Sequence, residues 1–429
     1  MSAPILLFSA FGTLLIMGAP ITLALALSAA VTYLYVGQEL TTLVQIAFSS
    51  VNSFPIMALP AFVLAGALME CAGISRRIVT VAEHMVGQMS GGLAITAVLA
   101  CVFFGAISGS GPATTAAVGM LMIPAMTRRG YKEDYAAAAV ATAGGIGIII
   151  PPSIPMVIYG VTAQESITKM FLGGVIPGFL FAFSLIGLHY CFCRGKDLAS
   201  GLPSFSLRNL FKSLGDGFYA VMAPVVILGG IYSGAFTPTE AAVVAIFYTM
   251  IVGIFIYKEM SLPTFMKSLE TTVWITGRVL IIMFAAYAFG RLLVQYRIPE
   301  VIAKGMLSVS SNHLVIWAMV TVFLLFLGMF METLATIIIL VPVLLPMILQ
   351  LGIDPIHFGI VLVVTNNVAM LTPPLGVNLF VASRIAGISV ERISVAVIPY
   401  LIALTLCILL FTYVPAISTW LPSLMGYGQ

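Results

Sequence analysis

The stretch Ala143-Gly-Gly-Ile-Gly-Ile-Ile-Ile-Pro-Pro-Ser153 has a counterpart 222 residues further along the chain, Thr365-Asn-Asn-Val-Ala-Met-Leu-Thr-Pro-Pro-Leu375. In both stretches a double proline removes backbone donors and clashes with the preceding helical turn, so each is predicted to interrupt a helix. Apolar segments broken at matching places in two halves are typical of transporters built from repeats, with the binding site at the breaks. Further landmarks recur at the same offset, namely Pro124, Gly130 and Val175-Ile176-Pro177 in the first half and Pro346, Gly352 and Val397-Ile398-Pro399 in the second.

The composition indicates a membrane protein. Of the 429 residues, 61% are hydrophobic and 8% are charged, and the mean hydropathy is +1.15. Soluble domains carry about 25% charged residues, so lipid is the solvent of this chain. Since one bilayer span needs about 20 apolar residues, the long apolar stretches predict roughly ten to twelve spans. The basic residues of the polar stretch 194–217 favour the cytoplasmic side of the membrane for it.

Several classes of function are disfavoured by what the sequence lacks. It has no G-x-x-x-x-G-K-[ST] phosphate loop, so we expect no ATP hydrolysis by that route. Neither H-E-x-x-H nor G-x-S-x-G occurs, which argues against a membrane protease or lipase, and we expect no enzymatic activity. The net charge of +3 is too small to indicate binding to nucleic acid.

An irregular run, Gly105-Ala-Ile-Ser-Gly-Ser-Gly-Pro-Ala-Thr-Thr115, separates two apolar segments of the first half. Its three glycines, one proline and four hydroxyl residues do not suit a helix that faces lipid. Because unsatisfied backbone groups are costly in hydrocarbon, irregular chain at this depth must be buried or line a cavity. The apolar segment that follows, Ala116–Ile123, is too short to cross a bilayer. The run therefore predicts a re-entrant helical hairpin with its tip near Ser108–Pro112.

The second half contains a similar region, Gly328-Met-Phe-Met-Glu-Thr-Leu-Ala-Thr336, followed by the short apolar segment Ile337–Leu345. We expect a second re-entrant hairpin here. Its tip carries Glu332, and an acidic residue between long apolar segments is rare and marks a substrate or ion pathway by default. Each hairpin is followed by one of the double-proline breaks, where unwound carbonyl groups are free to coordinate Na⁺.

The relative orientation of the halves depends on how many spans separate the hairpins. The apolar runs Pro4–Val36 and Tyr219–Tyr257 are interrupted at Gly18-Ala-Pro20 and Phe236-Thr-Pro-Thr-Glu240. If each run is one broken span, five crossings separate the hairpins and the second repeat is inverted; if the later run is two spans, six do. We expect the inverted arrangement. The predicted organisation is a first repeat over 1–200 with its hairpin at about 105–126, a polar connecting loop over 201–221, and a second repeat over 222–429 with its hairpin at about 328–346.

Four motifs in order along the chain resemble the large membrane subunit of tripartite ATP-independent periplasmic (TRAP) transporters. The similarity runs over essentially the whole chain, although Arg384 stands where a small residue is expected. The motifs are Gly105–Thr115, Pro151-Pro-Ser-Ile-Pro155, Phe236-Thr-Pro-Thr-Glu-Ala241 and the group Asn366-Asn367, Thr372-Pro-Pro374 and Asn378-Leu-Phe380.

The resemblance implies an all-α polytopic membrane protein of the bacterial inner membrane, with two inverted structural repeats, each containing a re-entrant helical hairpin and a broken helix. It also implies an elevator-type transporter, in which a mobile transport domain moves against a scaffold. Members of this family import organic acid anions, including C4-dicarboxylates, sialic acids and other sugar acids, and use a Na⁺ gradient. They receive the substrate from a soluble periplasmic binding protein and work with a small four-helix membrane subunit.

The first hairpin tip suits an anion. Gly109 and Gly111 allow backbone amides to approach it closely, and the half-helix after Pro112 presents a positive N-terminus. Ser153 follows the first double proline, whereas its repeat counterpart is Leu375, and this asymmetry favours contact with substrate rather than with an ion. The candidate substrate-binding residues are Ser108, Ser110, Ser153, Glu332 and Arg384.

By analogy with the family architecture, we expect at least two Na⁺ sites formed by neutral oxygens. Other interpretations stay open: Gly and Ser often serve close helix packing, the paired asparagines can bond between helices, and Glu332 can pair with Arg384. The first site is assigned to Ser108, Ser110 and carbonyls near Gly145, Ile148 and Pro151, and the second to Gly328, Thr333, Thr336, Asn366, Asn367 and Thr372.

Two other functions are compatible with a repeated membrane chain. A stand-alone symporter for dicarboxylates or citrate would share the repeat and need no binding protein. A channel would line whole helices with polar residues, whereas polarity here is confined to two hairpins and two breaks. A membrane-embedded enzyme would need a nucleophile and a base, and none of the four scattered histidines falls in either break. We therefore expect sodium-coupled secondary active import of an organic acid anion.

Overall fold

The computed structural model describes residues 2–86, 88–195, 205–310 and 312–427, and every element within them is helical. The helices of the first half are α1 (Ala3–Ile16), α2 (Ile21–Tyr35), α3 (Leu40–Val51), the short η1 (Phe54–Met57), α4 (Ala58–Cys71), α5 (Ile74–Val86), α6 (Gly92–Ser108), α7 (Gly111–Arg128), α8 (Glu133–Gly144), α9 (Ile146–Ile149), α10 (Ile154–Ala163) and α11 (Ile167–Cys193). Those of the second half are α12 (Leu207–Asp216), α13 (Phe218–Tyr232), α14 (Pro238–Ile251), η2 (Val252–Ile256), α15 (Leu262–Gln295), α16 (Ile298–Val309), α17 (His313–Gly328), α18 (Thr333–Gln350), α19 (Pro355–Ala369), α20 (Val377–Ala386), α21 (Val390–Tyr413), α22 (Ala416–Pro422) and η3 (Ser423–Tyr427).

The two halves use the same order of helices. At the offset found in the sequence, the hairpin α6–α7 matches α17–α18, α8 matches α19, and the helices after the break, α10 and α11, match α20 and α21. The earlier helices α1, α2 and α5 match α13, α14 and α16. Two regions differ: α3 and α4 are separated by η1, whereas the matching part of the second half is the single 34-residue helix α15, and α12 has no counterpart among the described helices of the first half.

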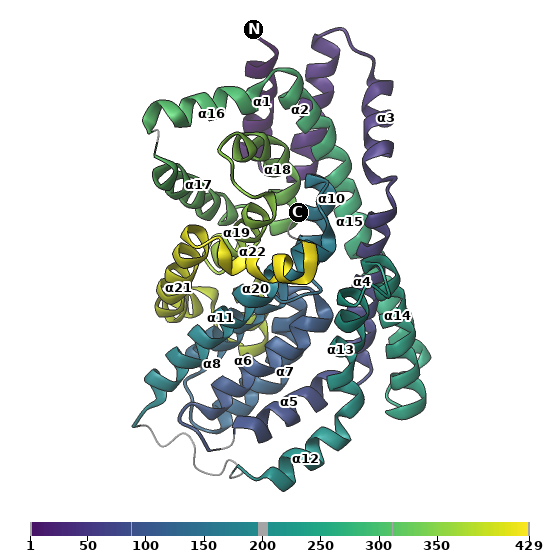
Figure 1. Cartoon of the computed structure of the whole chain (residues 1–429), viewed down its shortest axis with the longest axis vertical. Helices are drawn as coiled ribbons and strands as arrows, with labels where there is room; N and C mark the ends of the chain where they lie inside the picture. Colours follow the sequence, from purple (N-terminus) through teal and green to yellow (C-terminus); the bar gives the residue numbers. More distant parts are fainter. Residues whose placement is uncertain (1, 87, 196–204, 311, 428–429) are drawn as a thin grey trace.

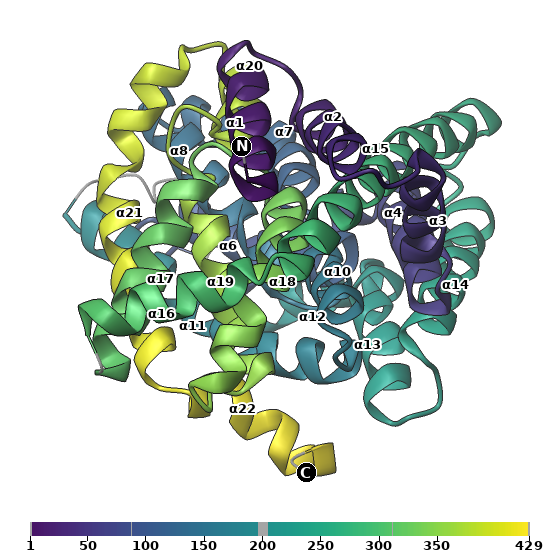
Figure 2. The same cartoon turned by 90° about the horizontal axis from the view of Figure 1, so that it is seen from above.

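The two hairpins enter the molecule from opposite ends (Figure 1). The lower part of that view holds α5, α6 and α7, with α12 nearby, and the upper part holds α16, α17 and α18. Seen from above, α3, α4, α14 and α15 lie on one side and α21 lies on the other, with α10 and α18 between them (Figure 2). The expected all-α fold with two inverted repeats is confirmed.

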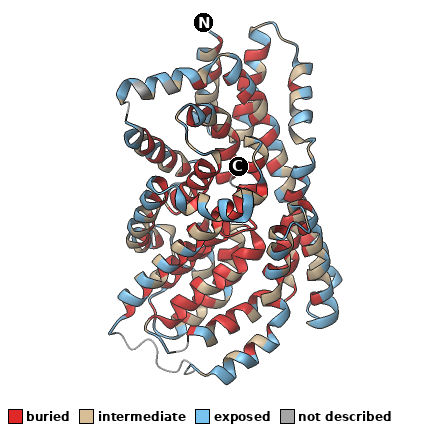
Figure 3. Ribbon diagram, in the orientation of Figure 1, coloured by how far each residue is buried: buried red, intermediate tan, exposed pale blue. Residues whose placement is uncertain are grey.

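Each half places the helix after its break against the hairpin of the other half. α10 packs on α18 and α19, and α20 packs on α7 and α8. Much of this region is deeply buried, most completely along α8 to α10 and α19 (Figure 3). The hairpins, the breaks and the helices that follow them therefore form one interlocked body, called the hairpin unit below (α6–α11 and α17–α21). The outer helices are α1–α4 and α13–α15.

The two long apolar runs that open the halves are each two packed helices rather than one broken span, yet five crossing segments still separate the hairpins, namely α8–α10, α11, the bent pair α12–α13, α14 with η2, and α15. α1 and α2 pack against each other, as do α13 and α14. Gly18 has a φ of +79° and Pro20 directly precedes α2, so one helix ends and a second begins with a new direction. In the second half Pro238, with a capping box formed by Thr237 and Glu240, starts α14 as a separate helix.

The number of full-length spans is also smaller than the roughly ten to twelve expected from one span per 20 apolar residues. Among the described residues, seven helices are long and apolar enough to cross a membrane, or eight if the bent pair α12–α13 counts as one span. Others, such as α1, α2, α6 and α19, are apolar but only 10–17 residues long. Reversals and breaks divide stretches that hydropathy alone treats as complete spans.

The stretch expected as a polar connecting loop, residues 201–221, contains a helix. Residues 201–204 lie outside the described part of the chain, but α12 follows closely and meets α13 at a bend of 68°. α12 exposes Leu207 and Phe211 beside the basic residues Arg208 and Lys212. This mixture is typical of a helix that lies in the membrane surface.

Candidate functional site

The tip of the first hairpin is tied together by hydroxyl groups. α6 ends at Ser108 with Gly109 as its C-cap, at a φ of +61°, and Ser110 is the N-cap of α7. The Ser108 and Thr114 hydroxyl oxygens lie 2.8 Å apart, and the Thr114 hydroxyl also donates to the Ser110 carbonyl at 2.8 Å. Ser108 is buried and Ser110 is half-buried. The two serines expected at this tip are therefore close together, with hydroxyl and carbonyl oxygens at its centre.

This tip rests directly on the first break. The Ile154 N–H donates to the Gly109 carbonyl at 3.2 Å. A Cβ atom at Gly109 would lie 2.7 Å from the Pro152 carbonyl oxygen, and one at Gly105 would lie 2.7 Å from Gly147 Cα. Only glycine leaves enough room for these approaches. The glycines of the sequence motif thus bring the hairpin and the break into contact.

The side chain of Ser153 joins the two sides of the first break by hydrogen bonds. It is the N-cap of α10, and its hydroxyl donates to the Ile148 carbonyl at 2.5 Å and accepts from the Met156 N–H at 3.4 Å. Its side chain is almost fully buried. The Gly145 carbonyl accepts from the Ile148 N–H at 3.1 Å. These contacts give Ser153 a defined structural role, in addition to the substrate contact expected from the sequence.

The second hairpin repeats this architecture with different side chains. Glu332 occupies the N-cap position of α18, where α7 has Ser110, and its side chain makes no capping bond. The Thr336 hydroxyl donates to the Glu332 carbonyl at 3.0 Å, and Thr333 donates to the Met370 sulfur at 2.8 Å. The half-buried carboxyl of Glu332 is therefore available to contact a group outside its own helix.

Asn366 and Asn367 carry the least satisfied polar groups of the site. Both are fully buried, and all four of their side-chain amide atoms lack a hydrogen-bond partner among the described residues. Asn366 lies against Gly328, where a Cβ would collide with its amide oxygen. Asn367 reaches into the other half, since a Cβ at Gly145 would lie 2.7 Å from its amide oxygen. An unsatisfied buried group costs about 1–3 kcal/mol, so this concentration of them indicates a site for a polar ligand.

Asn378 is a further polar residue of the site, and it is not among the residues predicted from the sequence. It lies at the start of α20, is buried, and donates from its amide to the Ala141 carbonyl at 3.3 Å. Its amide oxygen is buried without a partner among the described residues, and its amide nitrogen adjoins Gly111. The repeat counterpart of Asn378 is Met156, and this polar-to-apolar difference is a signal that could have identified it.

The structure brings most candidate residues to the two tips and breaks, but not Arg384. That residue is exposed in the last turn of α20, about 10 Å along the helix axis from its start. No ion pair joins it to Glu332 among the described residues. Thr372 lies in the turn after α19, with its N–H bonded to the Ala369 carbonyl at 3.0 Å.

The residues assigned to the two Na⁺ sites fit that ion chemically. Hydroxyl, amide and carbonyl oxygens at helix breaks are the groups that hold Na⁺ in transporters with broken helices. The strongest observation is on the second site, because its two asparagine side chains are buried and unsatisfied. The hydroxyls of the first site bond to one another, yet each hydroxyl oxygen retains a lone pair.

Comparisons with known proteins agree with this architecture. The sequence profile of the family described as tripartite ATP-independent periplasmic transporter, DctM component, matches residues 8–417. The isethionate TRAP transporter permease DctMQ of Oleidesulfovibrio alaskensis is 45% identical over 413 residues, which is 96% of this chain but 65% of that protein. The C4-dicarboxylate TRAP transporter large permease DctM of Pseudomonas aeruginosa is 41% identical over 379 residues, 88% of each chain.

A solved structure supports the fold independently of close sequence similarity. The YdaH transporter of Alcanivorax borkumensis, whose crystal structure is described as having an unusual topology, superposes with a TM-score of 0.63 at 16% identity. The match covers 93% of this chain and 89% of that one. Together with the apolar helices, the family match makes the chain a multi-pass protein of the bacterial inner membrane. The chain belongs to the DctM family of tripartite ATP-independent periplasmic transporters, as its motifs predict.

Proposed function

We propose that this chain is the translocating membrane subunit of a sodium-coupled importer for an organic acid anion. Its family membership supports secondary transport, and two relatives are named for isethionate and for C4-dicarboxylates. Both are small anions that carry a sulfonate or carboxylate group. The observation that carries the sodium coupling is the pair of buried, unsatisfied asparagine side chains, Asn366 and Asn367.

In this proposal the second half provides the better-defined ion site. The amide oxygens of Asn366 and Asn367 would hold Na⁺, together with oxygens of Gly328, Thr333 and Thr336. The bound ion supplies positive charge among these neutral oxygen ligands. Neutral ligands avoid an unpaired buried charge when the carrier is empty, and such a charge is costly within a membrane. The serines of the first tip and the carbonyls near Gly145, Ile148 and Pro151 form the other ion site.

The anion is assigned to the N-terminus of α7. The backbone amides after Gly109 point toward the tip, the helix end is positive, and Ser110 stands at its N-cap. Asn378 adds an amide nitrogen beside Gly111 from the other half of the chain. Glu332, in its protonated form, donates a hydrogen bond to the substrate from the second tip. The site thus combines one donor-rich hairpin with acceptor and amide groups of the other.

The proposed transport step moves the hairpin unit past the outer helices. The cross-packing of α10 on α18 and of α20 on α7 supports movement of the two hairpins as one body, in the manner of an elevator. Substrate would arrive from a periplasmic binding protein, and a small membrane subunit would brace the outer helices. The longer relative DctMQ, of which this chain spans 65%, is in keeping with such an additional part.

Uptake of labelled isethionate, succinate and sialic acid into proteoliposomes tests the proposal. The small subunit and the cognate binding protein are each included or omitted, with an inward Na⁺ gradient or none. We expect uptake of one acid that requires the gradient, the small subunit and the binding protein. Uptake without the binding protein would instead favour the stand-alone symporter. Uptake indifferent to Na⁺ would remove the sodium coupling from the proposal.

A further inference from the structure

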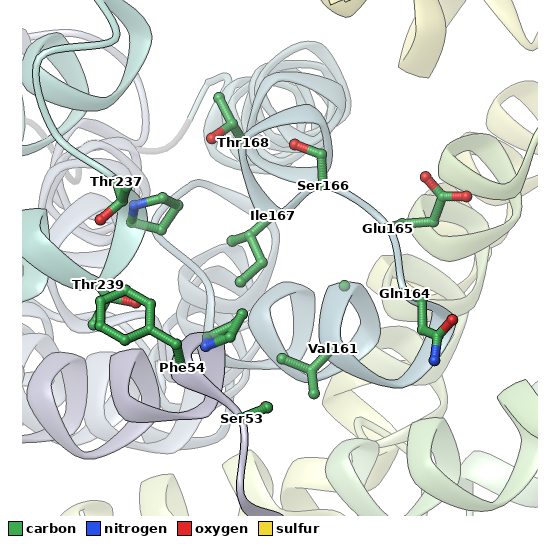
Figure 4. Close-up of a pocket in the computed structure, with 13 residues that line it drawn as sticks. Ser53, Phe54, Val161, Gln164, Glu165, Ser166, Ile167, Thr168, Thr237 and Thr239 are labelled. Atoms are coloured by element: carbon green, nitrogen blue, oxygen red, sulfur yellow. The ribbon is translucent and has the colours of Figure 1, made fainter.

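Two cavities lie between the hairpin unit and the outer helices. One, of about 520 Å³, is bordered by Phe54, Glu165 and Thr237 (Figure 4). The other, of about 510 Å³, lies between α3, the end of α10, α15 and α18. Gln164 lines both cavities. The carboxyl group of Glu165 makes the first cavity a poor place for an anion, whereas the second contains the guanidinium of Arg291.

Arg291 is an unpaired charge on a membrane-spanning helix. It lies one turn before the end of α15, its side chain is exposed toward the cavity, and no carboxylate among the described residues lies within 4.0 Å of it. By contrast, Arg76 and Arg77 are both paired with Glu259, Arg77 at 2.8 Å. Charged residues within spans are rare and mark the pathways of substrates or ions.

The neighbours of Arg291 suit an anion. Tyr287 stands four residues earlier on the same helix face and lines the same cavity. Thr162 and Gln164 face the cavity from the end of α10. A guanidinium binds a carboxylate or sulfonate through two parallel hydrogen bonds, and the hydroxyl and amide groups can donate to the remaining oxygens. The rest of the lining is largely apolar, which would strengthen these contacts.

The cavity lies on the periplasmic side of the central site, so an imported anion would reach the cavity first. α15 leads into α16, which lies at the end of the molecule opposite α12 and its basic residues (Figure 1). Since basic residues favour the cytoplasmic side, the cavity belongs to the periplasmic side. From there α10 runs ten residues, about 15 Å, to Ser153 at the central break. Four helices line this cavity. Of these, α10 and α18 belong to the hairpin unit, and α3 and α15 belong to the outer helices.

We propose that this cavity is a second anion subsite, in which Arg291 captures an organic carboxylate or sulfonate before it moves to the hairpin tips. The choice of ligand rests on the proposed function. Because Arg291 sits on an outer helix, its charge remains on the periplasmic side when the hairpin unit moves. The anion then leaves the arginine for the central site rather than travelling with it.

The charge of the cavity can be measured without transport. Ser49 is exposed in the same cavity on α3, so Ser49→Cys is introduced after Cys71, Cys191 and Cys407, the cysteines that are not buried, are replaced by Ser. The rates of modification by the anionic reagent sulfonatoethyl methanethiosulfonate and by its cationic trimethylammonium analogue are compared in zwitterionic liposomes. The anionic reagent should be favoured by about tenfold over the ratio for a free thiol. The preference should shrink as ionic strength rises.

Arg291→Gln should abolish this preference, and Arg291→Lys should retain most of it. Arg297→Gln is the matched control, because Arg297 lies nearby in the sequence but contacts Glu300 at 4.0 Å; it should leave the preference unchanged. Succinate or isethionate should slow the anionic reagent, whereas inclusion of anionic lipid should not. Protection by anionic lipid alone would reassign the cavity to a phosphate headgroup. An unreactive Ser49→Cys, or a preference indifferent to Arg291, would overturn the proposal.

Transport kinetics then distinguish this subsite from the central one. Arg291→Gln should raise KM for the transported acid by about tenfold and change kcat less than twofold, since the residue contacts substrate before the central site is filled. Arg291→Lys should recover only part of the lost affinity, because an ammonium group keeps the charge but cannot form the two parallel hydrogen bonds. If the cavity shows the charge preference but no acid is transported, the proposed function fails while the subsite stands. If transport is normal with KM unchanged in Arg291→Gln, the subsite has no part in uptake and the inference is wrong.

Discussion

The two halves of the chain build the same hairpin and the same break but place different side chains at the centre. At the start of the second hairpin limb, α7 has Ser110 and α18 has Glu332. On the helix before each double proline, the first half has Gly144-Gly145 and the second has Asn366-Asn367. The asparagine side chain of one half lies against the glycine of the other, as Asn367 lies against Gly145. The duplicated backbone therefore carries the paired asparagines in one half only.

This difference gives the two halves of a duplicated backbone different chemical groups at the centre. The glycines of the first half allow close backbone contact, so that half offers hydroxyls, carbonyls and a helix N-terminus. The second half offers the amides of Asn366 and Asn367 and the carboxyl of Glu332. If the two halves had the same role, removal of matching side chains would change Na⁺ dependence and stability equally in both. Because the side chains differ, we expect unequal effects.

The largest effect is expected from Asn366→Ala and Asn367→Ala. A coordination contact worth about 2–3 kcal/mol corresponds to about 30- to 150-fold in apparent Na⁺ affinity. Uptake measured against Na⁺ concentration should shift by that amount in either variant. The free energy of unfolding should change by less than about 1 kcal/mol, because loss of unsatisfied buried groups offsets loss of packing.

Asn312→Ala is a suitable control, since Asn312 caps α17 through a bond to the Leu314 N–H at 2.9 Å, away from the breaks. It should lower stability slightly and leave the Na⁺ dependence unchanged. If Asn366→Ala or Asn367→Ala lowered the unfolding temperature but left the Na⁺ dependence of uptake unchanged, these residues would serve only to join helices.

The next largest effect is expected from Gly109→Ala. This glycine has a φ of +61°, and a Cβ there would lie 2.7 Å from the Pro152 carbonyl oxygen. Gly352→Ala isolates the backbone cost, since Gly352 has a φ of +68° and no atom within 4 Å of such a Cβ. We expect a loss of about 1 kcal/mol at Gly352 and at least about twice that at Gly109, measured by unfolding in detergent. Equal losses would mean that the hairpin and the break are not held in contact.

Sequence patterns predict the hairpins and breaks well because glycine and proline act locally. The run Gly105–Thr115 forms the first hairpin tip at the expected place, and the double prolines interrupt their helices. The reversal at Gly18 was missed because hydropathy does not distinguish a bent span from two packed helices. Asn378 was missed because its partner Ala141 lies 237 residues away and such a contact leaves no local pattern, so only its difference from the repeat counterpart Met156 marks it.

The role of Ser153 in the fold was also not predicted from the sequence, and we expect its replacement to have a smaller effect than that of Gly109. Its repeat counterpart Leu375 has no hydroxyl, so the second break holds without such a bond. Ser153→Ala removes the bonds to Ile148 and Met156 and should lower the free energy of unfolding by about 1–2 kcal/mol. KM for the acid should change less than threefold, as determined by uptake at several substrate concentrations. A large rise in KM with normal stability would establish the substrate contact inferred from the repeat asymmetry.

The smallest effect is expected from Arg384→Gln. An arginine in the last turn of α20 interacts favourably with the negative end of that helix, which is worth about 0.3–1 kcal/mol of stability. Its exposed side chain lies a helix length away from Gly376, where the second break ends. Uptake should therefore remain within twofold of the unchanged protein, whereas Glu332→Gln, at the second tip, should lower it further. If each single variant lost uptake to the same extent and the double variant did not, Glu332 and Arg384 would be shown to pair. The site of the second half would then extend to the far end of α20.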